Sequence, residues 1–286
     1  MTGPRAGASP GEGALGIIAG GGDLPRLVAE AEAEAGRPPL VIRFAGTELP
    51  WAAAYPGAEI PHEKPGRLFA ALRGAGCGRV CFAGGMTRPR LNPLKFDATA
   101  LKLAPKALAL LGKGDDEMLR GFAQMLEAEG FRLVAAQDLL EGLVAKEGPL
   151  GRAPTEAEQA DAARARAIVA ALGPLDVGQG AVVAGGLCLG VEAIGGTDVL
   201  LGQVEGLPGR VRTAPGGVLY KGPKPGQDRR MDLPAIGPET LRRAHAAGLT
   251  GLCVAARGAL ILGRAEVAAE AKRLNLAVWA ASEAPA

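Results

Sequence analysis

The sequence predicts an α/β protein of two domains, and three observations point to that fold class. Apolar residues make up 48% of the 286 residues and aromatic residues only 3%, which suits aliphatic layers of helices packed on sheets. Short apolar runs alternate with helical patterns along the chain. The stretch from Glu147 to Pro154 has the Gly- and Pro-rich composition of a linker. We therefore expect a disordered leader over residues 1–13, a first domain over 14–150 and a second over 151–286.

Composition also excludes several classes of protein. The net charge is +2, from 32 basic and 30 acidic residues, which argues against nucleic-acid binding driven by overall charge. Cys77, Cys81, Cys188 and Cys253 form no CxxC pair, so we expect reduced, buried thiols in a cytosolic protein. No apolar run reaches membrane-spanning length, and residues 1–13 lack the apolar core of a signal peptide. These features predict a soluble protein.

The first domain opens with a strand, a glycine loop and a helix. Leu15–Ala19 is the strand, and Gly20, Gly21, Gly22 and Asp23 lead into an alanine-rich helix that ends near residue 35. This order is Rossmann-like, and the helix N-terminus would attract an anion. Because Pro25 stands where the dinucleotide fingerprint needs its third glycine, a mononucleotide or phosphate fits better than NAD. The four loop residues are therefore candidate ligand contacts, unless the turn needs glycine only for backbone freedom.

A second glycine loop follows the strand predicted over residues 78–83, after a helix over 66–75. It begins with Gly84–Gly85 and continues to Arg88. Parallel strands would bring both glycine loops to the carboxyl edge of one sheet, where ligands bind in such folds. Gly84 and Arg88 are therefore candidate phosphate contacts, although a lone loop arginine is more often solvated.

Charged residues precede the next predicted helix, which runs to about residue 129. Lys113, Gly114, Asp115 and Asp116 lie directly before it. Either aspartate could cap the helix N-terminus, which leaves the other carboxylate without a structural role. Lys113, Gly114 and Asp115 are therefore candidate ligand contacts. A strand over residues 131–135 and a short helix end the first half.

The second half begins with a capping box, Thr155 to Glu158, that opens a helix to about residue 171. Beyond Gln179, strands over residues 181–184 and 187–194 form a hairpin. Glu192 lies inside the second of these apolar strands, so its carboxylate needs a cation, a hydroxyl-rich ligand or a lysine, unless the strand is an edge with that face in water. Thr197 is the expected cap of the following helix, which also begins with Asp198.

A basic loop runs from Lys221 to Gly237, between a strand over residues 217–220 and a helix that starts at Pro238. Its first six residues include four prolines and glycines, and its charged side chains are Lys221, Lys224, Asp228, Arg229, Arg230 and Asp232. Basic groups can hold phosphate oxygens, and a carboxylate among them can hold a metal ion or orient a water. The alternative is a solvated turn whose charges pair among themselves. Predicted strands over residues 251–255, 258–262 and 276–280 and a helix over 264–274 complete a mixed α/β second domain.

Five motifs, taken together in this order and spacing, resemble one enzyme family. They span residues 16–25, 113–116, 176–179, 191–198 and 221–237. The family is the UDP-2,3-diacylglucosamine pyrophosphatases of lipid A biosynthesis, of the type unrelated to calcineurin-like phosphoesterases. The resemblance covers about residues 14–280, and the segment from Asp232 to Gly237 is its strongest part.

The resemblance implies hydrolysis of UDP-2,3-bis(3-hydroxyacyl)glucosamine to UMP and 2,3-diacylglucosamine 1-phosphate (lipid X) in Gram-negative bacteria. It also implies Mg²⁺, with Mn²⁺ as a substitute, and an active site between two domains on the cytoplasmic side. Transient contact with the inner membrane and a homodimer would be compatible with it. Asp232 matches the family's essential aspartate, and Asp232 and Asp198 are the candidate metal ligands. The alternative is a non-catalytic protein that binds or senses a nucleotide sugar. The expected substrate contacts are Gly20, Gly21, Gly22, Asp23, Gly84, Arg88, Lys113, Gly114, Asp115, Gln179, Glu192, Thr197, Asp198, Lys221, Lys224 and Gln227.

Overall fold

The protein divides into two compact α/β units. The computed structural model describes residues 13–86, 91–110, 114–210 and 214–282, with the backbone alone over 106–110. The first unit comprises the chain up to Leu140 together with Arg230–Asp232, and the second comprises Glu141–Arg229 and the chain from Leu233. The predicted α/β class with two domains is therefore confirmed. The predicted leader, residues 1–13, lies almost wholly outside the described residues.

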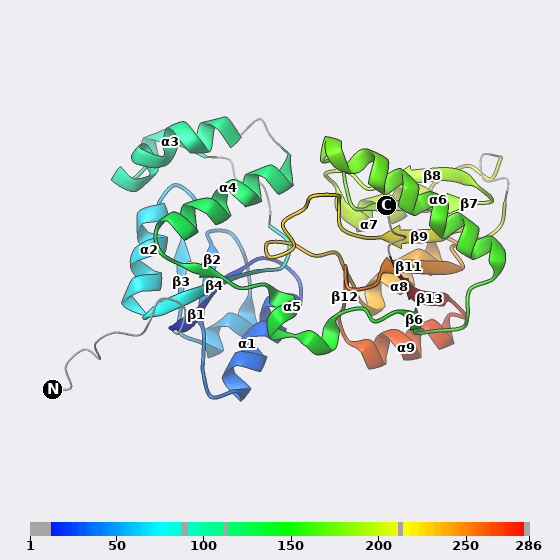
Figure 1. Ribbon diagram of the computed structural model, residues 1–286, viewed down its shortest axis with the longest axis horizontal. Coiled ribbons are helices and arrows are strands. Elements are labelled where there is room, and N and C mark those ends of the chain that lie inside the picture. The colour runs from blue at the N-terminus through cyan, green and yellow to red at the C-terminus, as the bar shows by residue number, and fades with distance from the viewer. Residues whose placement is uncertain (1–12, 87–90, 111–113, 211–213, 283–286) are drawn as a thin grey trace. The chain divides into compact units, whose positions relative to one another are not determined.

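The first unit is built on a parallel sheet, which confirms the Rossmann-like prediction (Figure 1). Neighbouring strands pair in parallel throughout. The order across the sheet is β3 (Gly57–Ile60), β2 (Leu40–Phe44), β1 (Ala14–Ala19), β4 (Cys77–Ala83) and β5 (Arg132–Leu133). All the carboxyl ends of these strands therefore meet at one edge.

Helices cover both faces of this sheet. Successive strand residues point to opposite faces, so neighbouring residues of β1 pack against different helices. Ile17 of β1 packs in a cluster with Val28 of α1 (Leu24–Glu34) and Ala136 of α5 (Ala136–Leu139). Ile18 packs on the other side with residues of α2 (Pro65–Gly74) and α4 (Asp115–Ala128). The sheet is thus buried on both faces, as parallel sheets generally are.

Two elements of the first unit were not predicted. Strand β3 has the sequence Gly-Ala-Glu-Ile, which lacks an apolar run or a clear alternation. Helix α3 (Ala98–Leu110) contains Pro105, a residue that normally argues against a helix interior. It packs against α2 and α4.

The second unit contains a mixed sheet of six strands. Its order is β6 (Gly148–Pro149), β13 (Ala277–Ala281), β11 (Gly251–Ala255), β9 (Val218–Lys221), β7 (Gly180–Ala184) and β8 (Leu187–Val191). The three central strands β13, β11 and β9 are parallel, and the remaining pairs are antiparallel. The hairpin predicted around Gly185–Gly186 is confirmed as β7–β8. A separate parallel pair joins β10 (Ala235–Ile236) to β12 (Leu260–Ile261).

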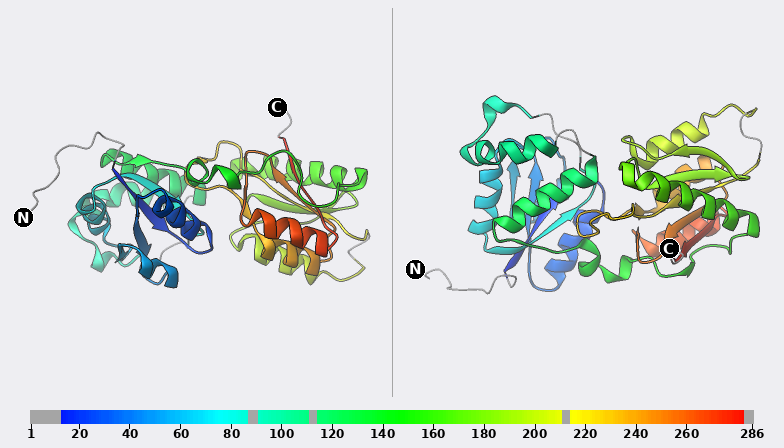
Figure 2. Two further views of the ribbon diagram at one scale, coloured as in Figure 1. Left: turned by 90° about the horizontal axis from the view of Figure 1, so that it is seen from below. Right: turned by 45° about the horizontal axis from the view of Figure 1, so that its top comes forward.

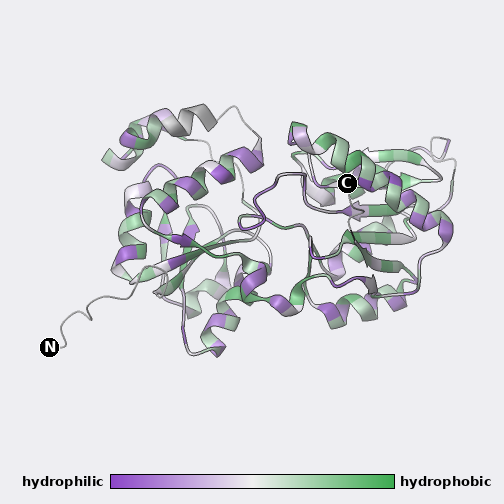
Figure 3. Ribbon diagram, in the orientation of Figure 1, coloured by the Kyte–Doolittle hydropathy of each residue, from purple (hydrophilic) through white to green (hydrophobic). Residues whose placement is uncertain are grey.

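Helices flank this second sheet as well (Figure 2). Helix α6 (Glu156–Leu172) packs on one face through Ala162, Ala165 and Val169. Helices α7 (Gly196–Glu205), α8 (Pro238–Ala246) and α9 (Arg264–Arg273) bury their apolar residues in the cluster on the other face. Figure 3 shows the strands of both sheets as mainly hydrophobic ribbon, while the helices carry hydrophilic stretches between hydrophobic ones.

The stretch predicted to be a linker, Glu147 to Pro154, instead belongs to the second unit. Gly148 and Pro149 form β6 and pair with Ala280 and Trp279 of β13. Pro149 has no N–H to donate to a neighbouring strand, and it is tolerated there because β6 is an edge strand. Composition alone could not reveal a strand of two residues.

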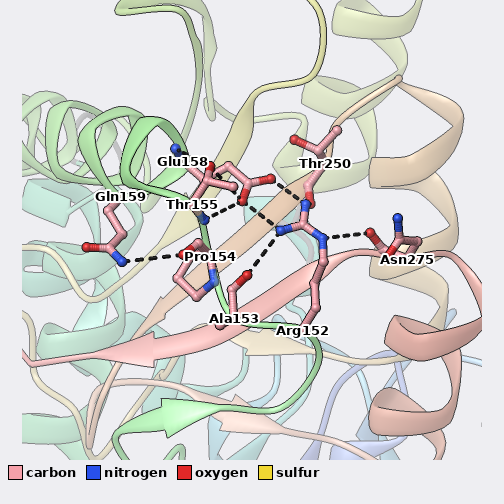
Figure 4. A network of polar contacts seen from close by, with 8 residues as sticks. All are labelled: Arg152, Ala153, Pro154, Thr155, Glu158, Gln159, Thr250 and Asn275. Carbon is pink, nitrogen blue, oxygen red and sulfur yellow. Dashed lines mark hydrogen bonds and ion pairs between the residues drawn. The ribbon is translucent and has the colours of Figure 1, made fainter.

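A polar network around Glu158 fastens this stretch to the unit (Figure 4). The predicted capping box is confirmed, with Glu158 N–H donating to Thr155 Oγ1 and Thr155 N–H donating to Glu158 Oε2. Arg152 donates to both oxygens of Glu158, at 2.8 and 2.5 Å, and to the backbone carbonyls of Thr250 and Asn275. Burial alone would raise the pKa of Glu158, but these hydrogen bonds outweigh it and lower the pKa to about 2.

The cysteines are free thiols, and three of them are buried as predicted. Burial raises the pKa of Cys77 to about 11 and those of Cys81 and Cys253 to about 12. The prediction is wrong for Cys188, which is exposed. That residue lies on the edge strand β8, whose first two residues, Leu187 and Cys188, are both exposed.

Candidate active site

The two glycine loops of the first unit contact each other through their backbones. Gly21 N–H donates to Gly85 O at 2.8 Å, and Gly85 N–H donates to Gly21 O at 2.9 Å. A Cβ added at Gly20 would lie 2.4 Å from Gly85 O, and one added at Gly84 would lie 2.4 Å from Gly21 O. Glycine is therefore required at Gly20 and Gly84 for this close approach. A Cβ at Gly22 or Gly85 would meet nothing within 4 Å, so these two positions face open space at the carboxyl edge of the sheet.

Asp23 follows the first glycine loop and is the N-cap residue of α1, although its side chain makes no capping hydrogen bond. Its carboxylate is 73% exposed and lies 3.5 Å from Arg26. Such a carboxylate would repel a phosphate but can accept hydrogen bonds from ligand hydroxyls.

The N-terminus of α4 differs from the prediction in one respect. Gly114 is the N-cap residue, so neither Asp115 nor Asp116 caps this helix. Both lie in its first turn with Glu117, where carboxylates interact favourably with the helix dipole. Asp116 also pairs with Arg120 at 2.6 Å. Arg88 and Lys113, two of the predicted contacts, lie outside the described residues.

The segment Arg230–Asp232 belongs to the first unit, although the sequence suggested that Asp232 lay in the second domain. Met231 is 6% exposed and is buried in the same apolar cluster as Phe82 and Leu133. Arg230 pairs with Glu127 of α4 at 2.8 Å. Asp232, which is partly buried, directly follows this anchored methionine. Packing thus fixes the side chain of Met231, and an ion pair fixes that of Arg230.

In the second unit, Glu192, Thr197 and Lys221 form a buried polar group. Lys221 Nζ donates to Thr197 Oγ1 at 2.6 Å, and Thr197 Oγ1 donates to Glu192 Oε2 at 2.7 Å. Lys221 Nζ lies 3.7 Å from Glu192 Oε2, and both side chains are 8% exposed. Glu192 therefore has the lysine partner that its apolar context required. The alternative of an edge strand with Glu192 in water is wrong, although β8 is an edge strand.

Thr197 was predicted to cap its helix, but it does not. Gly195 is the N-cap residue of α7, and no side chain caps it. The Thr197 hydroxyl instead links Lys221 to Glu192. The sequence could not reveal this choice, because the lysine comes from a strand 24 residues away along the chain.

The first part of the basic loop is held by the second unit. Lys224 forms an ion pair with Asp176, and its backbone N–H donates to Gln227 Oε1 at 2.9 Å. Gly222 N–H donates to Gln179 O at 3.0 Å. The backbone of Gln179, the side chain of Gln227 and Lys224 thus all shape this loop, and the Lys224 charge is balanced by Asp176.

Both halves of the chain match models of one protein family. Residues 14–143 match the LpxI N-terminal domain, and residues 146–279 match the LpxI C-terminal domain. The chain belongs to the LpxI family. It is also 41% identical over 268 residues to the UDP-2,3-diacylglucosamine pyrophosphatase LpxI of Caulobacter vibrioides, covering 92% of this chain and 96% of that protein. The family resemblance inferred from five motifs is therefore confirmed.

Asp198, a candidate metal ligand of this LpxI-family chain, lies in the first turn of α7. Its side chain is 63% exposed and lies 3.5 Å from Arg243 Nε. Among the described residues, no group of three or more His, Cys, Asp or Glu side chains is arranged to hold a metal ion. Among the described helices, none is both long and apolar enough to cross a bilayer.

Sequence reasoning missed an apolar pocket in the first unit of this LpxI-family protein. Its empty volume is about 1150 Å³, counting the part open to solvent, and it is lined by residues between Phe44 and Met125. Four of the chain's six phenylalanines and three of its five methionines line it. Their concentration in one third of an aromatic-poor chain was the signal that could have revealed it.

Proposed function

We propose that this chain hydrolyses the pyrophosphate bond of UDP-2,3-diacylglucosamine, releasing UMP and 2,3-diacylglucosamine 1-phosphate in lipid A biosynthesis. The observation that carries the proposal is 41% identity, over nearly the full length of both chains, to a protein of that name. Matches to both LpxI domains support it.

Asp232 is the catalytic carboxylate in this proposal. Negative phosphate oxygens repel an incoming water, so hydrolysis needs a group that orients the water and charges that stabilise the transition state. A carboxylate can do the first only when its position is fixed. Burial of Met231 and the ion pair of Arg230 with Glu127 support that role, because they hold the backbone on which Asp232 lies.

We further propose that Mg²⁺, or Mn²⁺ in its place, assists the reaction. The donor chemistry fits, because Mg²⁺ takes oxygen ligands and commonly uses one or two carboxylates plus substrate phosphates in place of a complete protein cage. Asp232 would hold the ion, which would supply charge neutralisation at the phosphates. Asp198 is the weaker candidate, since Arg243 already lies beside its carboxylate.

The basic side chains have different roles in this proposal. Lys221 is engaged by Thr197 and Glu192, so it would orient the loop and supply a fixed positive field. Lys224 would bind phosphate by exchanging Asp176 for the ligand. Such an exchange keeps the lysine paired in both states.

We also propose that the protein works in the cytoplasm and touches the inner membrane transiently, because its proposed substrate carries two acyl chains. Leu94 and Leu101 support this contact, since they are 95% and 62% exposed on the first unit. Exposed leucines next to Lys95 and Lys102 suit an anionic lipid surface.

The test is UMP release from UDP-2,3-diacylglucosamine by the full chain. We expect Asp232→Asn to lower turnover at least about 100-fold, the usual range for such a group, while substrate binding is largely kept. The control is Glu239→Gln, which removes an exposed carboxylate seven residues away and should leave turnover unchanged. Chelation with EDTA should abolish activity and Mg²⁺ should restore it.

Three outcomes would overturn parts of the proposal. If the wild-type chain bound the nucleotide sugar without releasing UMP, the protein would be the non-catalytic binder considered above. If Asp232→Asn kept more than about a tenth of turnover, Asp232 would not be the catalytic group. Full activity in excess EDTA would refute the proposed role of the metal ion.

A further inference from the structure

The apolar pocket of the first unit opens at the edge of the sheet where ligands bind in Rossmann-like folds. Phe44 is the last residue of β2, and His62 follows the end of β3. Met86 directly follows the glycine pair after β4. The carboxyl ends of three parallel strands therefore contribute to the pocket, at the same edge as the glycine loops.

The lining is apolar and deformable. Of the sixteen described residues that line the pocket, only His62 and Glu63 carry ionisable side chains. Met86, Met118 and Met125 contribute three unbranched, flexible side chains, which are typical of surfaces that adapt to an apolar ligand. An apolar ligand would therefore lose contact with water without leaving polar groups unpaired.

The ionisable residues of the lining suit a neutral chain with a polar end. The His62 ring stacks on Phe44 with 4.4 Å between ring centroids. Partial burial lowers the pKa of His62 despite the neighbouring Glu63, so its imidazole is neutral near pH 7. Glu63 accepts a hydrogen bond from the exposed backbone N–H of Asn92. No buried cation or anion thus opposes an uncharged alkyl chain.

From these observations we propose that this pocket binds an acyl chain of the substrate. The inference rests on the proposed function for the identity of the ligand, since a diacyl substrate must place two alkyl chains out of water. The pocket's position at the carboxyl edge would let one chain enter it while the polar part of the same molecule remains at the glycine loops. Helix α3 contributes Ala100 and Leu103 to the lining.

A binding assay tests the pocket without turnover. The probes are 3-hydroxy fatty acids of 6 to 14 carbons, which compete with a polarity-sensitive fluorescent fatty acid for the full chain. Each added methylene should tighten binding about fourfold until the pocket is filled. The pocket variant is Ala100→Trp, because Ala100 is 8% exposed and lines the pocket. The matched control is Ala70→Trp, which places the same indole on an exposed position of α2.

We expect Ala100→Trp to weaken the longest fatty acid at least tenfold and to raise KM for the diacyl substrate, while Ala70→Trp behaves as wild type. Leu103→Glu, which places a carboxylate in the lining, should weaken binding in the same way, and it serves as the test variant if Ala100→Trp does not fold. Equal fatty-acid binding by wild type and both folded pocket variants, or no binding by wild type, would overturn the inference. Fatty-acid binding without UMP release would leave the pocket standing and refute the proposed activity. Normal UMP release without fatty-acid binding would do the reverse.

Discussion

The ion pair between Arg152 and Glu158 offers a sharp test of how the second unit is stabilised. The change is Glu158→Gln, which keeps the size of the side chain and removes its charge. Glu158 is 7% exposed and accepts hydrogen bonds from Arg152 and Thr155. The variant therefore leaves the Arg152 guanidinium without its anion, in a partly buried setting where pairing matters.

The magnitude follows from the pKa of Glu158. The pKa falls from 4.5 to about 2 because hydrogen bonds from Arg152 and Thr155 outweigh the effect of burial, which alone would raise it. A shift of that size corresponds to about 3 kcal/mol of unfolding free energy. Because the folded-state pKa is lowered, this stabilisation is fully present above about pH 5 and is lost as the pH falls through the range from 4.5 to 2. The difference between wild type and Glu158→Gln should therefore be largest at pH 7 and should shrink towards pH 2.

The assay is urea unfolding monitored by fluorescence at several pH values. Trp51 lies in the first unit and Trp279 in the second, so a Trp51→Phe background isolates the second unit. The control is Glu156→Gln, which removes an exposed glutamate from the first turn of the same helix. That control should cost no more than about 1 kcal/mol through the helix dipole. Equal losses in the two variants at pH 7, or an unchanged pH dependence in Glu158→Gln, would refute the reasoning.

Two further changes test other parts of the structure. Gly84→Ala should destabilise the first unit by about 2 kcal/mol or more, because the added Cβ would lie 2.4 Å from Gly21 O and the φ of Gly84 is +87°. The control is Gly85→Ala, whose added Cβ would meet nothing within 4 Å and which should cost under about 1 kcal/mol. The unfolding free energies of the two variants are compared by Trp51 fluorescence in a Trp279→Phe background. Lys221→Met should destabilise the second unit by about 3 kcal/mol, because it leaves the Glu192 carboxylate buried without its cation. Adding Glu192→Gln should recover part of that loss, and a double variant no more stable than Lys221→Met alone would contradict the pairing.

Local patterns predicted much of the fold. The glycine loop after β1, the capping box at Thr155 and the hairpin at Gly185–Gly186 were all predicted correctly, because each depends on neighbours within a few residues. Strand β3 and helix α3 were missed, since tertiary packing overrides their weak local preferences.

The site was predicted less completely than the fold. The need of Glu192 for a cation followed from its apolar context, but the link from Glu192 through the Thr197 hydroxyl to Lys221 depends on a distant strand. The apolar pocket brings together side chains from two strands, three helices and the loops between them, a set that no periodicity can assemble. Membership of Asp232 in the first unit was also invisible, because it depends on where Met231 is buried.

The return of Arg230–Asp232 to the first unit has a consequence for how the chain is made. The core of the first unit includes Met231, so that core stays incomplete after the first 140 residues have been synthesised. Most of the second unit, from Glu141 to Arg229, leaves the ribosome before the missing side chain does. The nascent first unit must therefore persist with an unfilled apolar site during that interval. Hydrophobic surface exposed at that stage can bind chaperones or lead to misfolding. Completion of its core and emergence of Asp232 are then nearly the same event, since the two residues are adjacent in the chain.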